Sequence, residues 1–411
     1  MHPRDIRDKT IGMLGVFFRK VLSTYAPMKI LLCLAFCVWL IRNLNNSPTP
    51  SGPATVRNVT NITHSPKKAQ VLVTYAHNKL ITKKMPAVKK PVARPTRVPL
   101  TSMSKKLLGR DFFRDVIFPS TSCSGRNIEL IICVPTNRDN AAVRDAIRLT
   151  WGSYAWNGNR LGLNTTTIKE GSMGEIMIVF FVGSSSLVSS KDKQDKLFKE
   201  AKIYGDIYQA DFIDTYQNLT LKSISILNFV SLYCPNARYV AKIDDDIYVS
   251  IPVLMKEVKL VTKRLAVESH NKSNGFLTTP KFAWGFLFRA ASPMRKKNHK
   301  WYTSLEDYSP KFYPNYLSGT AYVMSGTAAL SLYEATLKVP IFWMEDIYVT
   351  GMCAAFARIP LIDGTRKALF SIHKRSEPTG CVFRKVISGH TYKPIDLITI
   401  HAQLNSPFLK C

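Results

Sequence analysis

The stretch YVAKIDDDIYV, residues 239 to 249, places three consecutive aspartates directly after a short apolar run. The run Tyr239 to Ile243 is typical of a strand buried on both faces of a sheet. Adjacent carboxylates repel one another unless they are exposed, hydrogen-bonded or neutralised, and a hard divalent cation neutralises them. The stretch therefore predicts a strand that ends at a cation and phosphate site, with a solvated acidic turn as the alternative.

Strand-like and helix-like segments alternate before this stretch. Apolar runs predict strands at Ile128 to Val134, Ile176 to Gly183 and around Asp206 to Ala210, and helical patterns cover Ala141 to Trp151, Lys191 to Tyr204 and an amphipathic Leu219 to Tyr233. This order is typical of βαβ units, whose parallel sheets bind ligands beyond the carboxyl ends of their strands. We expect one α/β domain over residues 111 to 411, since no linker divides them.

A second acidic pair lies in FWMEDIYV, residues 342 to 349. Glu345 and Asp346 are surrounded there by aromatic and β-branched residues, which is an environment that raises a carboxyl pKa and favours proton abstraction. The alternative is an acidic first turn of a helix, stabilised by the helix dipole.

A single transmembrane anchor is expected at residues 21 to 41. Ile30 to Ile41 is entirely apolar, and with the residues before it, which Lys29 interrupts, it approaches the ~20 residues that span a bilayer. A cleaved signal peptide is the alternative, but no small-residue cleavage site follows. Basic residues within 1 to 20 favour a cytoplasmic tail there and a lumenal remainder.

Residues 42 to 110 hold 14 Lys and Arg, no Asp or Glu, and eight prolines. Such a segment buries too little apolar surface to offset its ordering entropy, so we expect a disordered stem. The chain's formal net charge of +29 raises the question of a nucleic-acid partner. We expect none, because the densest basic run lacks the interleaved aromatics of nucleic-acid-binding surfaces.

Two further patterns fit a lumenal location. Acceptor tripeptides for N-glycosylation occur at Asn58, Asn61, Asn164, Asn218 and Asn271. Six cysteines lie outside the anchor, at 123, 133, 234, 353, 381 and 411, and none forms a CxxC pair of the kind that binds zinc. Disulfides are expected in an oxidising lumen, with the pairing left open.

Ordered blocks along residues 128 to 411 resemble the inverting β-1,3-glycosyltransferases, a family that includes β-1,3-galactosyltransferases and β-1,3-N-acetylglucosaminyltransferases. The blocks are VRDAIRLTWG (143 to 152), FFVG (180 to 183), YGDIYQADFIDTYQNLTLKS (204 to 223), KIDDDIYV (242 to 249), RKKNHKWY (295 to 302), YPNYLSGTAYVMS (313 to 325), EDIYVTGMCA (345 to 354) and the ending from Ser388 to Cys411. The resemblance implies a Rossmann-like GT-A fold, a UDP-sugar donor, Mn²⁺, transfer to a 3-hydroxyl of an acceptor glycan with inversion, and a Golgi membrane location.

The resemblance also implies roles for single residues. Asp246 resembles the direct metal ligand, with His390 as its partner, and Asp244 and Asp245 fall near the ribose and a metal-bound water. Asp346 resembles the catalytic base. On sequence alone His390 would be an ordinary surface histidine.

Two basic residues, Arg144 and Lys222, are candidates for donor binding. For each, a structural role in fixing or capping a helix is the alternative. Arg148 and Trp151 are expected to be structural.

The segment YLSGTAY, residues 316 to 322, departs from the family pattern. Leu317, Thr320 and Ala321 stand where the family has a cysteine and glycines, which predicts a reshaped acceptor side and leaves Cys234 unpaired or differently paired.

Galactose is the expected sugar, ahead of N-acetylglucosamine or N-acetylgalactosamine, and a homodimer is a possible assembly. The rival from another class is a non-catalytic lectin or chaperone of the secretory pathway.

Overall fold

The computed structural model describes residues 108–120, 123–156, 174–184, 191–270, 280–365, 368–374, 380–408 and 411. The expected tail and anchor and nearly all of the expected stem lie outside these residues. Within them, no helix has the length and apolar character needed to cross a bilayer.

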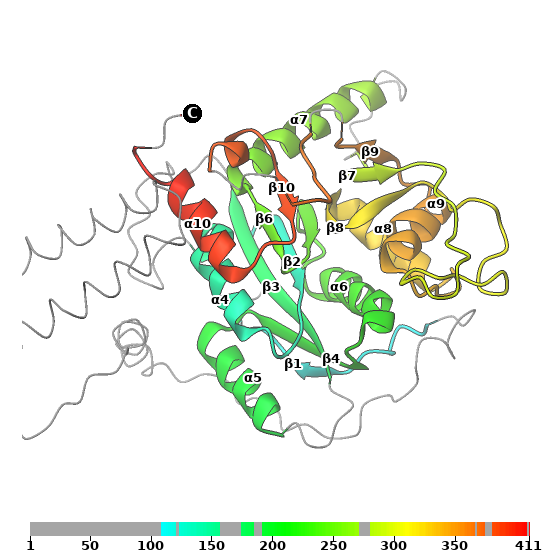
Figure 1. Cartoon of the computed structure of the whole chain (residues 1–411), viewed down its shortest axis with the longest axis horizontal. Helices are drawn as coiled ribbons and strands as arrows, with labels where there is room; N and C mark the ends of the chain where they lie inside the picture. The colour runs from blue at the N-terminus through cyan, green and yellow to red at the C-terminus, as the bar shows by residue number, and fades with distance from the viewer. Residues whose placement is uncertain are drawn as a thin grey trace, which may run out of the picture. The chain divides into compact units, whose positions relative to one another are not determined.

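A central sheet of eight strands organises the described residues into a mixed α/β fold (Figure 1). Its order is β1-β4-β3-β2-β5-β8-β7-β9. The strands are β1 (Asp115–Ile117), β2 (Ile128–Pro135), β3 (Glu175–Ser184), β4 (Ile207–Ile213), β5 (Tyr239–Ile243), β7 (Ala283–Phe288), β8 (Tyr316–Ser325) and β9 (Leu361–Asp363). The strands β4, β3, β2 and β5 are parallel, as the βαβ alternation predicted. A separate antiparallel pair joins β6 (Ile247–Val249) to β10 (Ser388–His390).

The path of the chain reverses its direction across the sheet between β2 and β5. From β2 the chain steps outward through β3 to β4, and it then returns to place β5 on the opposite side of β2. Connections that leave two neighbouring strands in opposite directions open a ligand-binding crevice at the strands' carboxyl ends. Because β5 ends at Ile243, the aspartates that follow it lie at this point.

Helices cover both faces of the sheet (Figure 1). One face carries α6 (Leu219–Tyr233) and α8 (Gly326–Thr336), and the other carries α4 (Ala141–Leu149), α5 (Lys191–Tyr204), α7 (Ile251–His270) and α10 (Pro394–Leu404). The remaining short helices are η2 (Trp151–Trp156), η4 (Tyr216–Asn218), η5 (Ile347–Cys353), α9 (Ala354–Phe356) and η6 (Val382–Arg384). The expected helix Ala141 to Trp151 thus ends at Leu149 and continues as a tighter turn.

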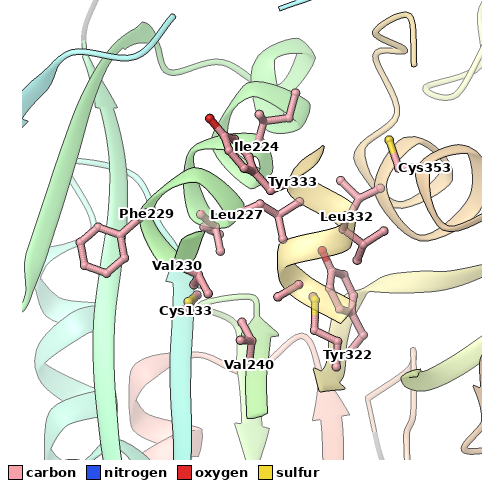
Figure 2. Packing of buried hydrophobic residues seen from close by; sticks show 14 of the residues in the cluster. Cys133, Ile224, Leu227, Phe229, Val230, Val240, Tyr322, Leu332, Tyr333 and Cys353 are labelled. Carbon is pink, nitrogen blue, oxygen red and sulfur yellow. The ribbon is translucent and has the colours of Figure 1, made fainter. Parts of the chain in front are cut away.

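Alternation along the strands builds two separate cores, because successive side chains of a strand point to opposite faces. Cys133 of β2 belongs to the α6 and α8 side, whereas Ile132 belongs to the other. Figure 2 shows Cys133 gathered with Val240 of β5 and with Leu227 and Val230 of α6. Helix α6 is buried from Thr220 to Val230 without a break, so the expectation of an amphipathic helix was wrong: the sheet, α8 and η5 enclose it.

A buried ion pair ties α4 to the start of β4. Arg148 donates to both carboxylate oxygens of Asp206, at 2.9 and 2.8 Å, and each of the two side chains is only 1% exposed. Burial raises the pKa of the Asp206 carboxyl, although the Arg148 charge opposes this shift. Breaking such a pair leaves an uncompensated charge in the interior.

Two disulfides are formed by described cysteines, Cys123 with Cys234 and Cys381 with Cys411. Cys234 is therefore differently paired, as one of the two expectations had it. Leu317, at the position where the family has a cysteine, is fully buried in the core on the α6 side.

Replacing Arg148 with Met is expected to lower the free energy of unfolding by about 3 to 5 kcal/mol, because it leaves the Asp206 carboxylate buried and unpaired. Urea denaturation measures the loss. The matched control is Arg264→Met, whose pair with Glu268 is exposed on α7 and whose loss should cost less than about 1 kcal/mol. Equal losses in the two variants would contradict the prediction.

Candidate active site

The three aspartates leave β5 in a tight turn that is held by the backbone. The amide of Asp244 donates to the carbonyl of Thr320 in β8 at 3.0 Å, and the amide of Ile247 donates back to the carbonyl of Asp244 at 3.3 Å. The turn leads at once into β6. The aspartates are therefore fixed between two strands, which disfavours the alternative of a solvated acidic turn.

Asp244 and Asp245 point to different partners. Asp244 accepts a hydrogen bond from the buried Lys242 ammonium at 2.7 Å. Asp245 accepts from the hydroxyl of Thr136 at 2.6 Å and from the side-chain amide of Asn140 at 2.9 Å, both just beyond the end of β2. The contacts of Asp245 join the segment after β2 to the turn after β5. Burial raises the pKa of Asp244 to about 7, although the Lys242 charge opposes the rise.

Asp246 faces His390, which β10 brings beside β6. The His390 Nε2 lies 3.2 Å from the Asp246 Oδ2, and its Nδ1 lies 3.0 Å from the carbonyl oxygen of Ile372. A neutral imidazole donates its Nδ1–H to that carbonyl, so its Nε2 lone pair faces the carboxylate. Two acceptors at this distance need a proton or a cation between them. The hydrogen bond to Asp246 accordingly raises the pKa of His390, against the effect of burial.

This pair fits the family's divalent cation in chemistry and in number. Within the described residues, no group of three or more Asp, Glu, His or Cys side chains is arranged to hold a metal. Magnesium and manganese at diphosphate sites commonly take only one or two protein ligands and complete their shell with phosphate oxygens and water. A carboxylate and an imidazole nitrogen are therefore a sufficient protein contribution.

Asp346 begins η5 at the same edge of the sheet. Its Oδ1 accepts from the amide of Ile347 at 2.9 Å, and its Oδ2 accepts from the amide of Gly319 in β8 at 3.4 Å. Burial, followed by the charge of neighbouring Glu345, raises the pKa of Asp346 to about 6. Asp346 thus both caps a helix and has a raised pKa, so the two interpretations of the acidic pair hold together. A carboxyl with such a pKa can accept a proton near neutral pH.

Lys242 and Glu345 complete the arrangement, and no functional role was assigned to Lys242 from the sequence. Glu345 is 8% exposed, accepts from the hydroxyl of Tyr322 at 2.8 Å and lies 3.4 Å from the Lys242 ammonium. One signal was available: a lysine inside an otherwise apolar, buried strand needs an anionic partner. Thr136 and Asn140 were also missed, although Thr136 follows β2 directly and Asn140 immediately precedes α4.

Arg144 and Lys222 do not contact the acidic run of Asp244, Asp245 and Asp246. Arg144 is fully buried and donates to both Glu200 oxygens and to the carbonyls of Asn137 and Arg138. Lys222 donates to Asp214 and to the carbonyl of Thr136. This placement favours the structural alternative for both, because each fixes the loop that carries Thr136 and Asn140 to Asp245.

Other sequence-based expectations have clear outcomes. Trp151 is buried and donates its indole N–H to the carbonyl of Ile247 at 3.0 Å, so it has the expected structural role below the aspartates. Asn218 is 3% exposed and donates its side-chain amide to the carbonyl of Ile213. The burial of its side-chain amide disfavours Asn218 as a glycan acceptor among the five tripeptides.

Comparisons with known proteins relate this chain to a family of glycosyltransferases. The model of the family described as Galactosyltransferase matches residues 142–365. "Beta-1,3-galactosyltransferase 2" of Mus musculus is 30% identical over 295 residues, which are 71% of this chain and 63% of that protein. "Lactosylceramide 1,3-N-acetyl-beta-D-glucosaminyltransferase" of Homo sapiens is 30% identical over 270 residues, 65% of this chain and 64% of the relative. "UDP-GalNAc:beta-1,3-N-acetylgalactosaminyltransferase 1" of Mus musculus is 30% identical over 291 residues, which are 71% of this chain and 78% of that protein.

The match spans somewhat less than two thirds of the length of the first of these relatives. The family model covers strands β3 to β9 and both acidic segments, whereas β1 and β2 precede the matched residues. By the family match and by the extent of these similarities, the chain belongs to the Galactosyltransferase family.

Proposed function

We propose that this protein is a UDP-sugar-dependent, inverting β-1,3-glycosyltransferase with a GT-A fold. The proposal rests on one observation: a pair of side chains that can bind a cation and a carboxylate that can act as a base lie at the same edge of the sheet. Asp246 and His390 form the pair, and Asp346 is the carboxylate whose raised pKa suits a base. Lys242 links the two regions through its contacts with Asp244 and Glu345.

The residues divide the chemistry between them. Asp346 accepts the proton of the acceptor's 3-hydroxyl while that oxygen attacks the anomeric carbon, and inversion by single displacement needs no protein nucleophile. Asp246 and His390 would hold a divalent cation, for which we propose Mn²⁺, and its charge would stabilise the UDP leaving group. Asp244 and Asp245, fixed by Lys242 and by the β2 side of the crevice, line the donor site.

The transferred sugar is proposed to be galactose. The names of the three relatives carry galactose, N-acetylglucosamine and N-acetylgalactosamine at the same identity of 30%, so overall similarity does not separate the donors. Galactose comes first because the family description and the first of these relatives share it. We further propose a Golgi enzyme anchored through residues 21 to 41, with its catalytic part lumenal, while a homodimer stays a prediction.

Removing the cation or either of its proposed ligands should abolish turnover. EDTA should suppress UDP release from a UDP-sugar in the presence of acceptor, and added Mn²⁺ should restore it. Asp246→Ala and His390→Ala should each lower kcat/KM by at least about 100-fold, since they remove stabilisation of the leaving group. Asp195→Ala, an exposed carboxylate on α5, is the control and should keep full activity.

Metal-independent UDP release would refute this assignment. If no UDP-sugar is turned over while glycans still bind to Asp246→Ala and Asp346→Asn, the protein is a lectin instead.

Activity should fall on the acidic side of a pKa near 6. A catalytic base works in its deprotonated form, which predominates above the Asp346 pKa of about 6 and is lost below it. The value of kcat/KM should therefore be flat above that pH and decline about tenfold per pH unit below it. Asp346→Asn should lower kcat at least about 100-fold, and its residual rate should lack this acidic limb. A wild-type limb that persists unchanged in Asp346→Asn would assign it to another group.

A further inference from the structure

We propose that Lys242 is a positioning residue that acts on Asp346 through Glu345 and Gly319, so that one buried ammonium holds the acidic run and the catalytic base in a common frame. The inference rests on the proposed function, because it takes Asp346 as the base. It goes further because it assigns the residue that sets the position and the protonation of that base.

The contacts of Lys242 reach three segments. Its side chain is only 5% exposed, and its ammonium lies 2.7 Å from Asp244, within hydrogen-bond reach of the Gly319 carbonyl, and 3.4 Å from Glu345. An ammonium has three donors, and here each faces an oxygen of a different element. The end of β5, the strand β8 and the residue before Asp346 are thereby joined at one point.

Gly319 carries this connection to the base. Its carbonyl accepts from Lys242, and its amide donates to the Asp346 carboxylate at 3.4 Å. A Cβ at this position would lie 2.7 Å from the Glu345 carboxylate and 3.4 Å from the Cβ of Asp346. A larger residue here would therefore have to displace the Glu345 carboxylate that Lys242 contacts.

The charges around Lys242 are unequal. Three carboxylates, those of Asp244, Glu345 and Asp346, share one ammonium in a buried region. The charge of Glu345 raises the pKa of Asp346, and the charge of Lys242 lowers it. The further titratable groups that interact with Asp346 are the hydroxyls of Tyr313, Tyr316 and Tyr322. These hydroxyls are neutral near pH 6, because a phenol titrates near 10 and burial raises each pKa further. Beside the effect of burial, Glu345 and Lys242 are therefore the charged neighbours that act on the Asp346 pKa in opposite directions.

Opposite changes in the Asp346 titration test the proposal. Glu345→Gln removes the repelling charge and should move the Asp346 titration to lower pH by roughly one unit, whereas Lys242→Met removes the attracting charge and should move it to higher pH by a similar amount. The double variant should return toward wild type. The readout is the side-chain carboxyl ¹³C resonance of Asp346 in the full chain, assigned as the signal absent from Asp346→Asn. The acidic limb of kcat/KM should move in parallel.

Arg148→Met is the matched control, because it also removes a buried cation but one that pairs with Asp206, away from the base. It should lower stability and leave the Asp346 titration unchanged. A purely structural role for Lys242 and Glu345 would give the same pattern as this control, and shifts that are absent or equal in sign would overturn the proposal. If Lys242→Met does not fold, the downward shift in Glu345→Gln decides the question.

The NMR titration also separates this proposal from the proposed function. Opposite shifts without turnover of any UDP-sugar would uphold the positioning network and refute the enzyme. Turnover that depends on Asp346, without the shifts, would do the reverse.

Discussion

Mutual repulsion of clustered, partly exposed carboxylates is the constraint around which this edge of the sheet is built. Each acidic side chain there is compensated differently: Asp244 by an ammonium, Asp245 by a hydroxyl and an amide, and Asp346 by backbone N–H groups. Asp246 faces only an imidazole, which can share a proton or a cation with it. The differences in compensation explain why four neighbouring carboxylates can serve distinct purposes, as holders, ligand and base.

The elements that bring these compensating groups together are remote in sequence. Lys242 meets the Gly319 carbonyl 77 residues away and Glu345 103 residues away, and Asp245 meets Thr136 across 109 residues. Arg144 and Lys222 act one step further out, by holding the loop from which Thr136 and Asn140 reach Asp245. The fold thus supports the site through two further buried cations, which do not contact the acidic run themselves.

This distance in sequence marks the limit of what could be predicted. The bounds of α5, α6 and β5 followed from their local patterns, and the site's place followed from the rule that ligands bind beyond the ends of parallel strands. The antiparallel half of the sheet was not predicted, because β8, although ten residues long, begins with small and polar residues and lacks the continuous apolar run of the parallel strands. The prediction of an amphipathic α6 was wrong because burial there, as at Asn218, is imposed by neighbours that local sequence does not reveal. His390 and Asp346 were placed by family resemblance, not by any local signal.

The disulfide between Cys381 and Cys411 encloses β10 and α10, and therefore His390, in a closed ring with a sequence separation of 30. In the chain-entropy view, closing a ring of this size lowers the conformational entropy of the unfolded chain and thereby stabilises the fold by about 3 to 4 kcal/mol. Part of the ordering needed to bring an imidazole to Asp246 is thus accomplished by a covalent bond. The histidine that faces the acidic run is in this way coupled to the redox conditions of the compartment in which the chain folds.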